Sequence, residues 1–277
     1  MAMSIRTNVA SLNAQKNIMA TEGALNTSLA RLSSGFRITK AGDDAAGLGI
    51  SSNLTAQIAS YNQAARNAAD GVSVIQTAEG ALNETNNILS RLRELAMQSS
   101  SSGVGNTERG YIQNEVTQLV SEIDRIANGT EYNGQALLNG TVSTLTFQVG
   151  IRNVAANDRI SVNTVSATAA SLSVDSANLG MSTAGSAQAA LATIDAAIQE
   201  IASARATLGA AGNRFETVSN TIRTASENLA AGNSRIRDVD VAEETSAMSR
   251  AQILVQAGVS VLAQANQMPQ MAMKLLG

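Results

Sequence analysis

Asp43 and Asp44 are adjacent carboxylates between two glycines, and they are the first residues of this chain whose types could do chemistry. Paired carboxylates can hold a cation or exchange a proton when they point at one another. Neighbouring residues on a helix instead point about 100° apart, because the helix has 3.6 residues per turn. No further acidic cluster adjoins them. We therefore expect a structural turn in which the carboxylates cap a helix or pair with a basic residue such as Arg37.

The residue types of this chain also argue against other kinds of catalytic site. The chain has no His and no Cys, so the usual general bases, thiol nucleophiles and metal ligands are missing. The segment Gly47-Leu48-Gly49 lacks the third glycine and the preceding strand of a dinucleotide fingerprint. We predict no catalytic, cofactor-binding or metal-binding residues, and a protein that is not an enzyme.

Composition narrows the class further. The 277 residues include one Pro, no Trp and only 2% aromatic residues, so helices can run long and their cores must be aliphatic. The formal net charge is −3 and no basic run occurs, which excludes nucleic acid as an expected partner. No stretch of about 18 apolar residues exists, so membrane insertion is not expected. The N-terminus lacks the features of a cleaved secretory signal.

Apolar residues repeat at helical spacing over very long segments. A heptad series runs through residues 54–96, and its partner positions drift as they do in one straight helix of roughly 50 residues, about 75 Å long. A second helix is predicted around residues 112–126. The third, over residues 190–229, places large residues at one heptad position and mostly alanine at the other, which is typical of a tight coiled-coil seam. We expect Gly232-Asn233 to end it.

Between the second and third helices the period changes to two. Leu145, Phe147 and Val149 alternate with polar residues, as do Ile160 and Val162, which predicts a β-hairpin at about residues 141–165. Residues 166–185 are predicted to be a loop with one short strand near residues 172–174. The fold class is therefore mainly α: a long antiparallel coiled-coil-like helical rod with a small β-hairpin, its termini paired as a helical coiled coil. We assign residues 1–43 and 236–277 to a terminal helical domain and residues 44–235 to the rod.

Each terminus carries an apolar stripe with no evident partner inside the rod. At the C-terminal end a seven-residue repeat of large residues is flanked by the small residues Ala251, Gly258, Ala265 and Ala272. Stripes of this kind are covered by another helix or by other copies of the chain, and contacts that do not close on themselves grow into a filament. The predicted self-assembly seam comprises Leu12, Met19, Leu29, Leu254, Val261, Met268 and Leu275.

Several segments in order resemble bacterial flagellin. They cover roughly residues 1–140 and 186–277, and they are SIRTNVASLNAQ at 4–15, RLSSG at 31–35, AGDDAAGL at 41–48, YNGQALL at 132–138, MSRAQIL at 248–254 and QANQMPQ at 264–270. The resemblance implies a short flagellin without outer domains. Such a protein is secreted through the flagellar export apparatus and polymerises into the hollow extracellular filament, with its paired terminal helices lining the inner tube.

The resemblance also implies partners. These are other copies of the chain, the flagellar export chaperone, the filament cap, the hook-junction proteins and the vertebrate Toll-like flagellin receptor. Arg91, Leu95 and Glu115 fall on the positions that the receptor contacts in many flagellins; on composition alone they are a solvated helix face with weak charge pairs. Alternatives to the filament subunit are the hook–filament junction protein, which shares related terminal helices, and a secreted coiled-coil adhesin or effector.

Overall fold

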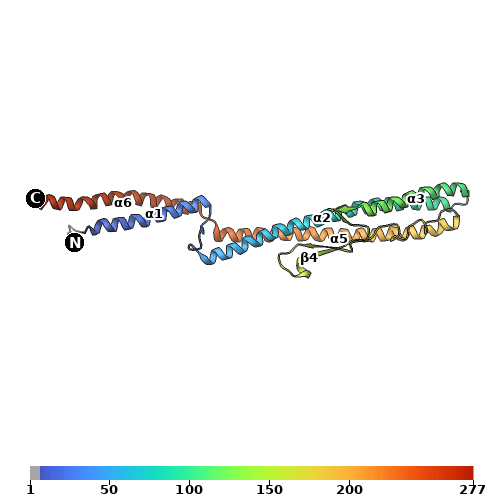
Figure 1. Cartoon of the computed structure of the whole chain (residues 1–277), viewed down its shortest axis with the longest axis horizontal. Helices are drawn as coiled ribbons and strands as arrows, with labels where there is room; N and C mark the ends of the chain where they lie inside the picture. The colour runs from blue at the N-terminus through green and yellow to red at the C-terminus, as the bar shows by residue number, and fades with distance from the viewer. Residues whose placement is uncertain (1–6, 277) are drawn as a thin grey trace. The chain divides into compact units, whose positions relative to one another are not determined.

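A computed structural model of the chain describes the backbone of residues 7–276 and the side chains of residues 7–267. Helices dominate it, as the heptad patterns predict (Figure 1). The helices are α1 (Val9–Ser34), α2 (Ala45–Ser100), α3 (Asn106–Gly129), α4 (Ala155–Asp158), α5 (Ala184–Arg237) and α6 (Val241–Leu276). Two antiparallel strand pairs join β1 (Glu131–Tyr132) to β2 (Gln135–Ala136) and β3 (Thr144–Gln148) to β4 (Arg159–Asn163).

The chain divides into two compact units. One combines Met1–Ile58 with Glu227–Gly277 and contains α1 and α6; we call it the terminal unit. The other is Ala59–Ser226 and contains α3, both strand pairs and most of α2 and α5; we call it the helical core unit.

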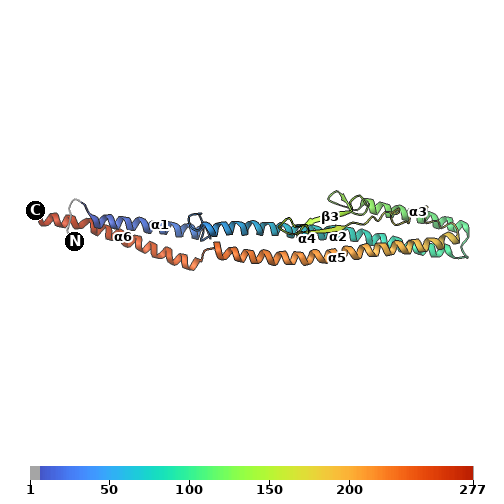
Figure 2. The ribbon, with the colours of Figure 1, turned by 90° about the horizontal axis from the view of Figure 1, so that it is seen from below.

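In the helical core unit, α2 and α5 lie side by side and antiparallel (Figures 1 and 2). Polar contacts at successive levels give their direction, because rising numbers in one helix meet falling numbers in the other. Arg93 pairs with Asp195 at 2.6 Å and Glu79 with Arg205 at 3.7 Å. The antiparallel arrangement predicted from the sequence is thus present.

Large and small residues alternate across this contact. Ile194, Ile201 and Leu208 of α5 are buried together with the intervening Ala190, Ala197 and Ala204. Alanine at one heptad position lets two helix backbones approach closely, and the long aliphatic residues then fill the space between them. Val116 and Ile123 of α3 complete the same core.

The hairpin predicted near residues 141–165 is formed by β3 and β4. Phe147 is paired with Ile160 in the ladder, and its ring makes a T-shaped contact with the Phe215 ring on α5, with centroids 5.3 Å apart. The side chain of Asn67 on α2 donates a hydrogen bond of 2.8 Å to the Gln148 carbonyl. An aromatic contact and a hydrogen bond therefore hold the hairpin on the α2–α5 pair.

The strand expected near residues 172–174 is absent, and that prediction was wrong. The chain makes a tight turn here: Ser173 has φ = 58°, and the Val174 N–H donates to the Ala169 carbonyl at 2.9 Å. Leu172 and Val174 are nevertheless buried. They lie in a folded loop that packs on the helical core, so their apolar side chains are buried although no strand forms there.

The stop expected at Gly232-Asn233 was also wrong, because α5 continues to Arg237. Glycine in a helix interior costs only about 0.5–1 kcal/mol relative to alanine, so neighbouring contacts can override it. Asn233 makes one such contact, since its side-chain amide lies 3.5 Å from the Thr55 hydroxyl of α2.

Gly71 and Gly80 of α2 offer a matched test of the packing in the helical core unit. A Cβ at Gly71 would lie 2.7 Å from the Phe215 ring, whereas a Cβ at Gly80 would meet nothing within 4 Å. Gly71→Ala should lower the free energy of unfolding by about 1–3 kcal/mol through overpacking. Gly80→Ala should raise it by about 0.5–1 kcal/mol through better helix propensity.

Urea unfolding followed by circular dichroism measures both values. Equal effects of the two substitutions would contradict the close approach of α2 to the Phe215 ring.

Candidate functional site

The terminal helices α1 and α6 pack against each other as an antiparallel pair (Figures 1 and 2). Contacts at both ends define their alignment. At one end the Asn8 amide donates a hydrogen bond of 2.8 Å to the Ala265 carbonyl. At the other, Arg31 and Glu244 form an ion pair at 3.6 Å, with both side chains largely covered.

The residues that form this contact follow a heptad on each helix, with alternating spacings of three and four. We call this contact the intrachain seam. On α1 it consists of Ser11, Ala14, Ile18, Thr21, Leu25, Ser28 and Leu32, and on α6 of Glu244, Met248, Ala251, Val255, Gly258, Leu262 and Ala265; all are buried or half-buried. Small and polar residues alternate in it with larger apolar ones such as Ile18, Leu25 and Leu262, which are half-buried.

Other large apolar residues of both helices lie outside the intrachain seam. Leu12, Met19 and Leu29 of α1 are 56%, 69% and 46% exposed, and Leu254 and Val261 of α6 are 52% and 56% exposed. We call these five residues the exposed apolar faces. Met268 and Leu275, the other predicted members, lie outside the residues whose side chains are described.

The small and the large residues of the predicted stripe thus have different roles. The small residues Ala251 and Ala265 face the partner helix, whereas the large residues at the neighbouring heptad position face outward. Sequence reasoning missed Ile253 and Val259, which are 65% and 54% exposed and extend the apolar surface of α6. Their signal is present in the sequence, as apolar residues one or two positions before the chosen residues Leu254 and Val261.

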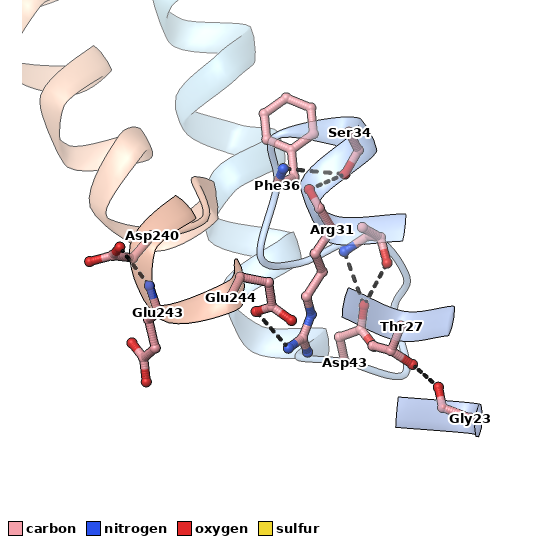
Figure 3. A network of polar contacts seen from close by, with 10 residues as sticks. Gly23, Thr27, Arg31, Ser34, Phe36, Asp43, Asp240, Glu243 and Glu244 are labelled. Carbon is pink, nitrogen blue, oxygen red and sulfur yellow. Dashed lines mark hydrogen bonds and ion pairs between the residues drawn. The ribbon is translucent and has the colours of Figure 1, made fainter. Parts of the chain in front are cut away.

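The connection between α1 and α2 is held against the start of α6, as Figure 3 shows in part. Gly35 ends α1 with φ = 75°, a left-handed conformation suited to glycine, and its N–H donates to the Arg31 carbonyl. Phe36 and Asp238 then form an isolated antiparallel bridge, and the Arg237 guanidinium lies 4.2 Å from the Phe36 ring centroid. We call this region the junction.

Carboxylates at the junction cap helices and turns. Asp44 accepts a hydrogen bond of 2.8 Å from the Gly47 N–H at the start of α2, and Asp240 accepts from the N–H groups of Ala242 and Glu243 at the start of α6. Asp43 accepts from the Lys40 N–H and from the hydroxyl and N–H of Thr39, and these bonds lower the pKa of its carboxyl, the Lys40 bond most.

The carboxylates therefore act as caps, one of the two roles expected. Arg37, named above as a possible partner, instead donates to the Ile236 carbonyl at 2.6 Å, because the bridge beside it draws its side chain toward the end of α5.

In the described part of the chain no group of three or more acidic residues is placed to hold a metal ion. A search of the same residues finds no helix with the length and hydropathy needed to span a membrane.

The three candidate receptor contacts lie on α2 and α3. Arg91 is half-exposed and forms hydrogen bonds with Glu94 and Glu115, each 2.9 Å long, which raise the pKa of its guanidinium. Leu95 is only 2% exposed and belongs to the core. A large partner can therefore reach the side chains of Arg91 and Glu115 but not that of Leu95, because α3 and α5 cover the heptad face on which Leu95 lies.

Comparison with known proteins agrees with this architecture. The model of the bacterial flagellin N-terminal helical region matches residues 5–143, and that of the bacterial flagellin C-terminal helical region matches residues 191–276. The flagellin of Halalkalibacterium halodurans is 42% identical over 274 residues, which cover 99% of this chain and 100% of the relative. The flagellar filament 33 kDa core protein of Treponema phagedenis is 41% identical, with the same coverage.

A solved structure is also similar. The crystal structure of Bacillus cereus flagellin aligns with a TM-score of 0.50 and 29% identity, covering 61% of this chain and 94% of that one. The two regions that match the family models contain α1, α2, α3, most of α5 and α6. The chain belongs to the bacterial flagellin family and is a structural subunit of the flagellar filament.

Proposed function

We propose that the exposed apolar faces of α1 and α6 are the surface through which copies of this chain polymerise. The observation that carries the proposal is their exposure: Leu12, Met19, Leu29, Leu254 and Val261 are each about half or more accessible in the single chain. Clustered apolar residues on paired helices mark an interaction surface, in contrast to scattered ones. The intrachain seam leaves them free because other positions of the two helices form it.

Polymer growth follows from the arrangement of these faces. Covering one aliphatic side chain contributes about 1.5–3 kcal/mol, so several on each helix provide enough free energy to order the terminal helices against neighbouring copies. Contacts between different surfaces of identical chains repeat without closing, and they generate a helical filament. Met268 and Leu275 continue the same repeat in the sequence and are proposed as members of the surface.

We further propose how the chain is exported and which partners it meets. As a flagellin the chain is expected to be secreted by the flagellar export apparatus, to be kept unassembled by the export chaperone, and to meet the hook-junction proteins and the filament cap outside the cell. The sequence methionines Met268, Met271 and Met273 suit an adaptable surface that contacts a chaperone first and neighbouring copies later.

Seeded growth separates the filament subunit from the alternatives. Purified chain added to short filament seeds should extend them many-fold in length, as seen by electron microscopy. Addition of a single layer would indicate a hook–filament junction protein, and no addition would indicate a coiled-coil adhesin or effector. The full-length identity to flagellins favours extension.

Val261→Asp tests the surface directly. A carboxylate at this position would have to be buried without a partner in the polymer, so elongation should stop at concentrations where the native chain elongates. Val261→Leu preserves the apolar face and should elongate, while circular dichroism should show the same helix content for both. Sedimentation measures the polymerised fraction; normal elongation by Val261→Asp would exclude Val261 from the surface.

We also propose that Arg91 and Glu115 form part of a surface gripped by the vertebrate Toll-like flagellin receptor. Their side chains are exposed, joined across α2 and α3 by one ion pair, and set beside Glu94. Leu95 would support this surface indirectly, because its burial in the core holds α2 against the neighbouring helices.

Arg91→Ala should reduce receptor activation in a reporter-cell assay with little change in the urea midpoint, because the side chain is exposed. Arg93→Ala is the matched control: Arg93 is as exposed, but it pairs with Asp195 on α5 and should leave activation unchanged. Leu95→Ala should lower the free energy of unfolding by about 2–5 kcal/mol, as cavity-forming core substitutions do. Equal activation by the native chain and Arg91→Ala would remove the receptor proposal.

A further inference from the structure

The small residues of the intrachain seam repeat in a way that leaves its alignment ambiguous. Ala251, Gly258 and Ala265 are spaced seven residues apart on one face of α6. Sliding α6 along α1 by seven residues, about 10 Å at 1.5 Å per residue, would bring another small residue opposite the same place on α1. The heptad pattern alone therefore does not choose one register over the next.

Gly258 distinguishes one register from its neighbours. A Cβ at this position would lie 2.8 Å from Cγ1 of Ile18 and 3.5 Å from its Cδ1. Ile18 is β-branched and stiff at χ1, so it cannot swing away freely within a helix. In either neighbouring register Ile18 would face alanine, Ala251 or Ala265, and a methyl group would occupy the space that it fills against glycine.

Polar contacts at the far end of the pair select the same register. The Ser11 hydroxyl, in a residue that is 7% exposed, donates a hydrogen bond of 2.8 Å to the Asn266 side-chain oxygen. The Asn8 side chain donates to the Ala265 carbonyl and also caps α1 by accepting from the Ser11 N–H. A shift of seven residues would replace Asn266 by Val259 or Met273 and leave the buried Ser11 hydroxyl without this partner, whereas a backbone carbonyl would still be opposite Asn8.

We propose that Gly258 against Ile18, together with Ser11 against Asn266, specifies the register of α1 and α6. The junction aligns the helices where they leave the connections near Gly35 and Asp238, and these residues fix the alignment several turns further on. Polar or specially shaped residues in an otherwise repetitive helix contact commonly select register in this way.

The effect of this register on assembly rests on the proposed self-assembly surface. Leu12 and Met19 lie on α1, whereas Leu254 and Val261 lie on α6, so the register decides how the two exposed apolar faces are offset. A neighbouring copy must match that offset to cover both. Ile18 and Gly258 are thus positioning residues for assembly, although they belong to the intrachain seam and not to the exposed faces.

Disulfide trapping measures the register without background, because the chain has no cysteine. Thr21 and Val255 lie on the seam faces one turn from the Ile18–Gly258 contact, so Thr21→Cys with Val255→Cys reports the native register. Thr21→Cys with Met248→Cys or with Leu262→Cys reports a slip by one heptad in either direction. Non-reducing gels of soluble and sedimented chain distinguish intrachain from interchain disulfides.

Gly258→Ala, added to the native reporter pair, should slow trapping about tenfold, and the slipped reporters should gain in rate. Ile18→Ala in the same chain should restore the native rate, because it removes the group that the new methyl meets. Gly23→Ala is the control, since a Cβ at Gly23 of α1 meets nothing within 4 Å; it should leave the rate unchanged.

An unchanged native rate in Gly258→Ala, an equal fall in Gly23→Ala, or no restoration by Ile18→Ala would overturn the assignment, as would failure of the native reporter pair to form a disulfide. The readout does not require a polymer. If trapping responds as expected while filament growth stays normal in Gly258→Ala, the register assignment stands and its link to the proposed assembly surface fails.

Discussion

The close approach of α1 and α6 is the constraint on which the terminal unit depends. Two helices can come this near only where small residues meet, and Ser11, Ala251 and Ala265 provide such places. Larger residues such as Ile18 and Leu25 alternate with these small ones in the contact and are half-buried. Leu12, Met19, Leu254 and Val261 lie at other heptad positions and are exposed. Close pairing within the chain and apolar surface for other chains are therefore two consequences of one packing arrangement.

The two units of the chain use alanine-rich heptads differently. In the helical core unit, small residues of α5 are combined with long aliphatic ones on the same contact, and the contiguous hydrophobic core runs from Ala64 to Ile222. In the terminal unit, Ile38, Ala251 and Ala265 are the buried hydrophobic residues among those that are described. The helical core unit buries many large side chains, whereas the terminal unit leaves many of its own exposed.

Much of this organisation can be predicted from the sequence. The heptad through residues 54–96, the alternation around Phe147 and the large-and-small pattern around Ile201 are strong, repeated signals, and they specified the long helices, the hairpin and the antiparallel pairing. Local signals were less reliable. Gly232 did not end α5, and residues 172–174 formed a turn, because tertiary contacts outweighed the preferences of single residues.

The face of each terminal helix that meets its partner helix was harder to predict. A stripe of large residues beside a stripe of small ones indicates a seam, but it does not say which stripe meets the chain's own partner helix. That depends on the distance between the helix axes, which is fixed by particular pairs such as Ile18 and Gly258. The burial of Leu95 was missed for a related reason: it lies among the charged residues Arg91, Arg93 and Glu94, although it continues the buried positions Leu82, Leu89 and Leu92 at helical spacing.

The central claim is that neighbouring copies cover the large apolar residues that the intrachain seam leaves exposed. Labelling of Leu254→Cys with a maleimide, in soluble chain and in seeded filaments, tests this claim most directly, with Val154→Cys at the exposed turn before α4 as the reference. Leu254→Cys should react readily in the soluble chain and become unreactive in filaments, while Val154→Cys stays reactive in both. Equal reactivity of Leu254→Cys in the two states would contradict the account.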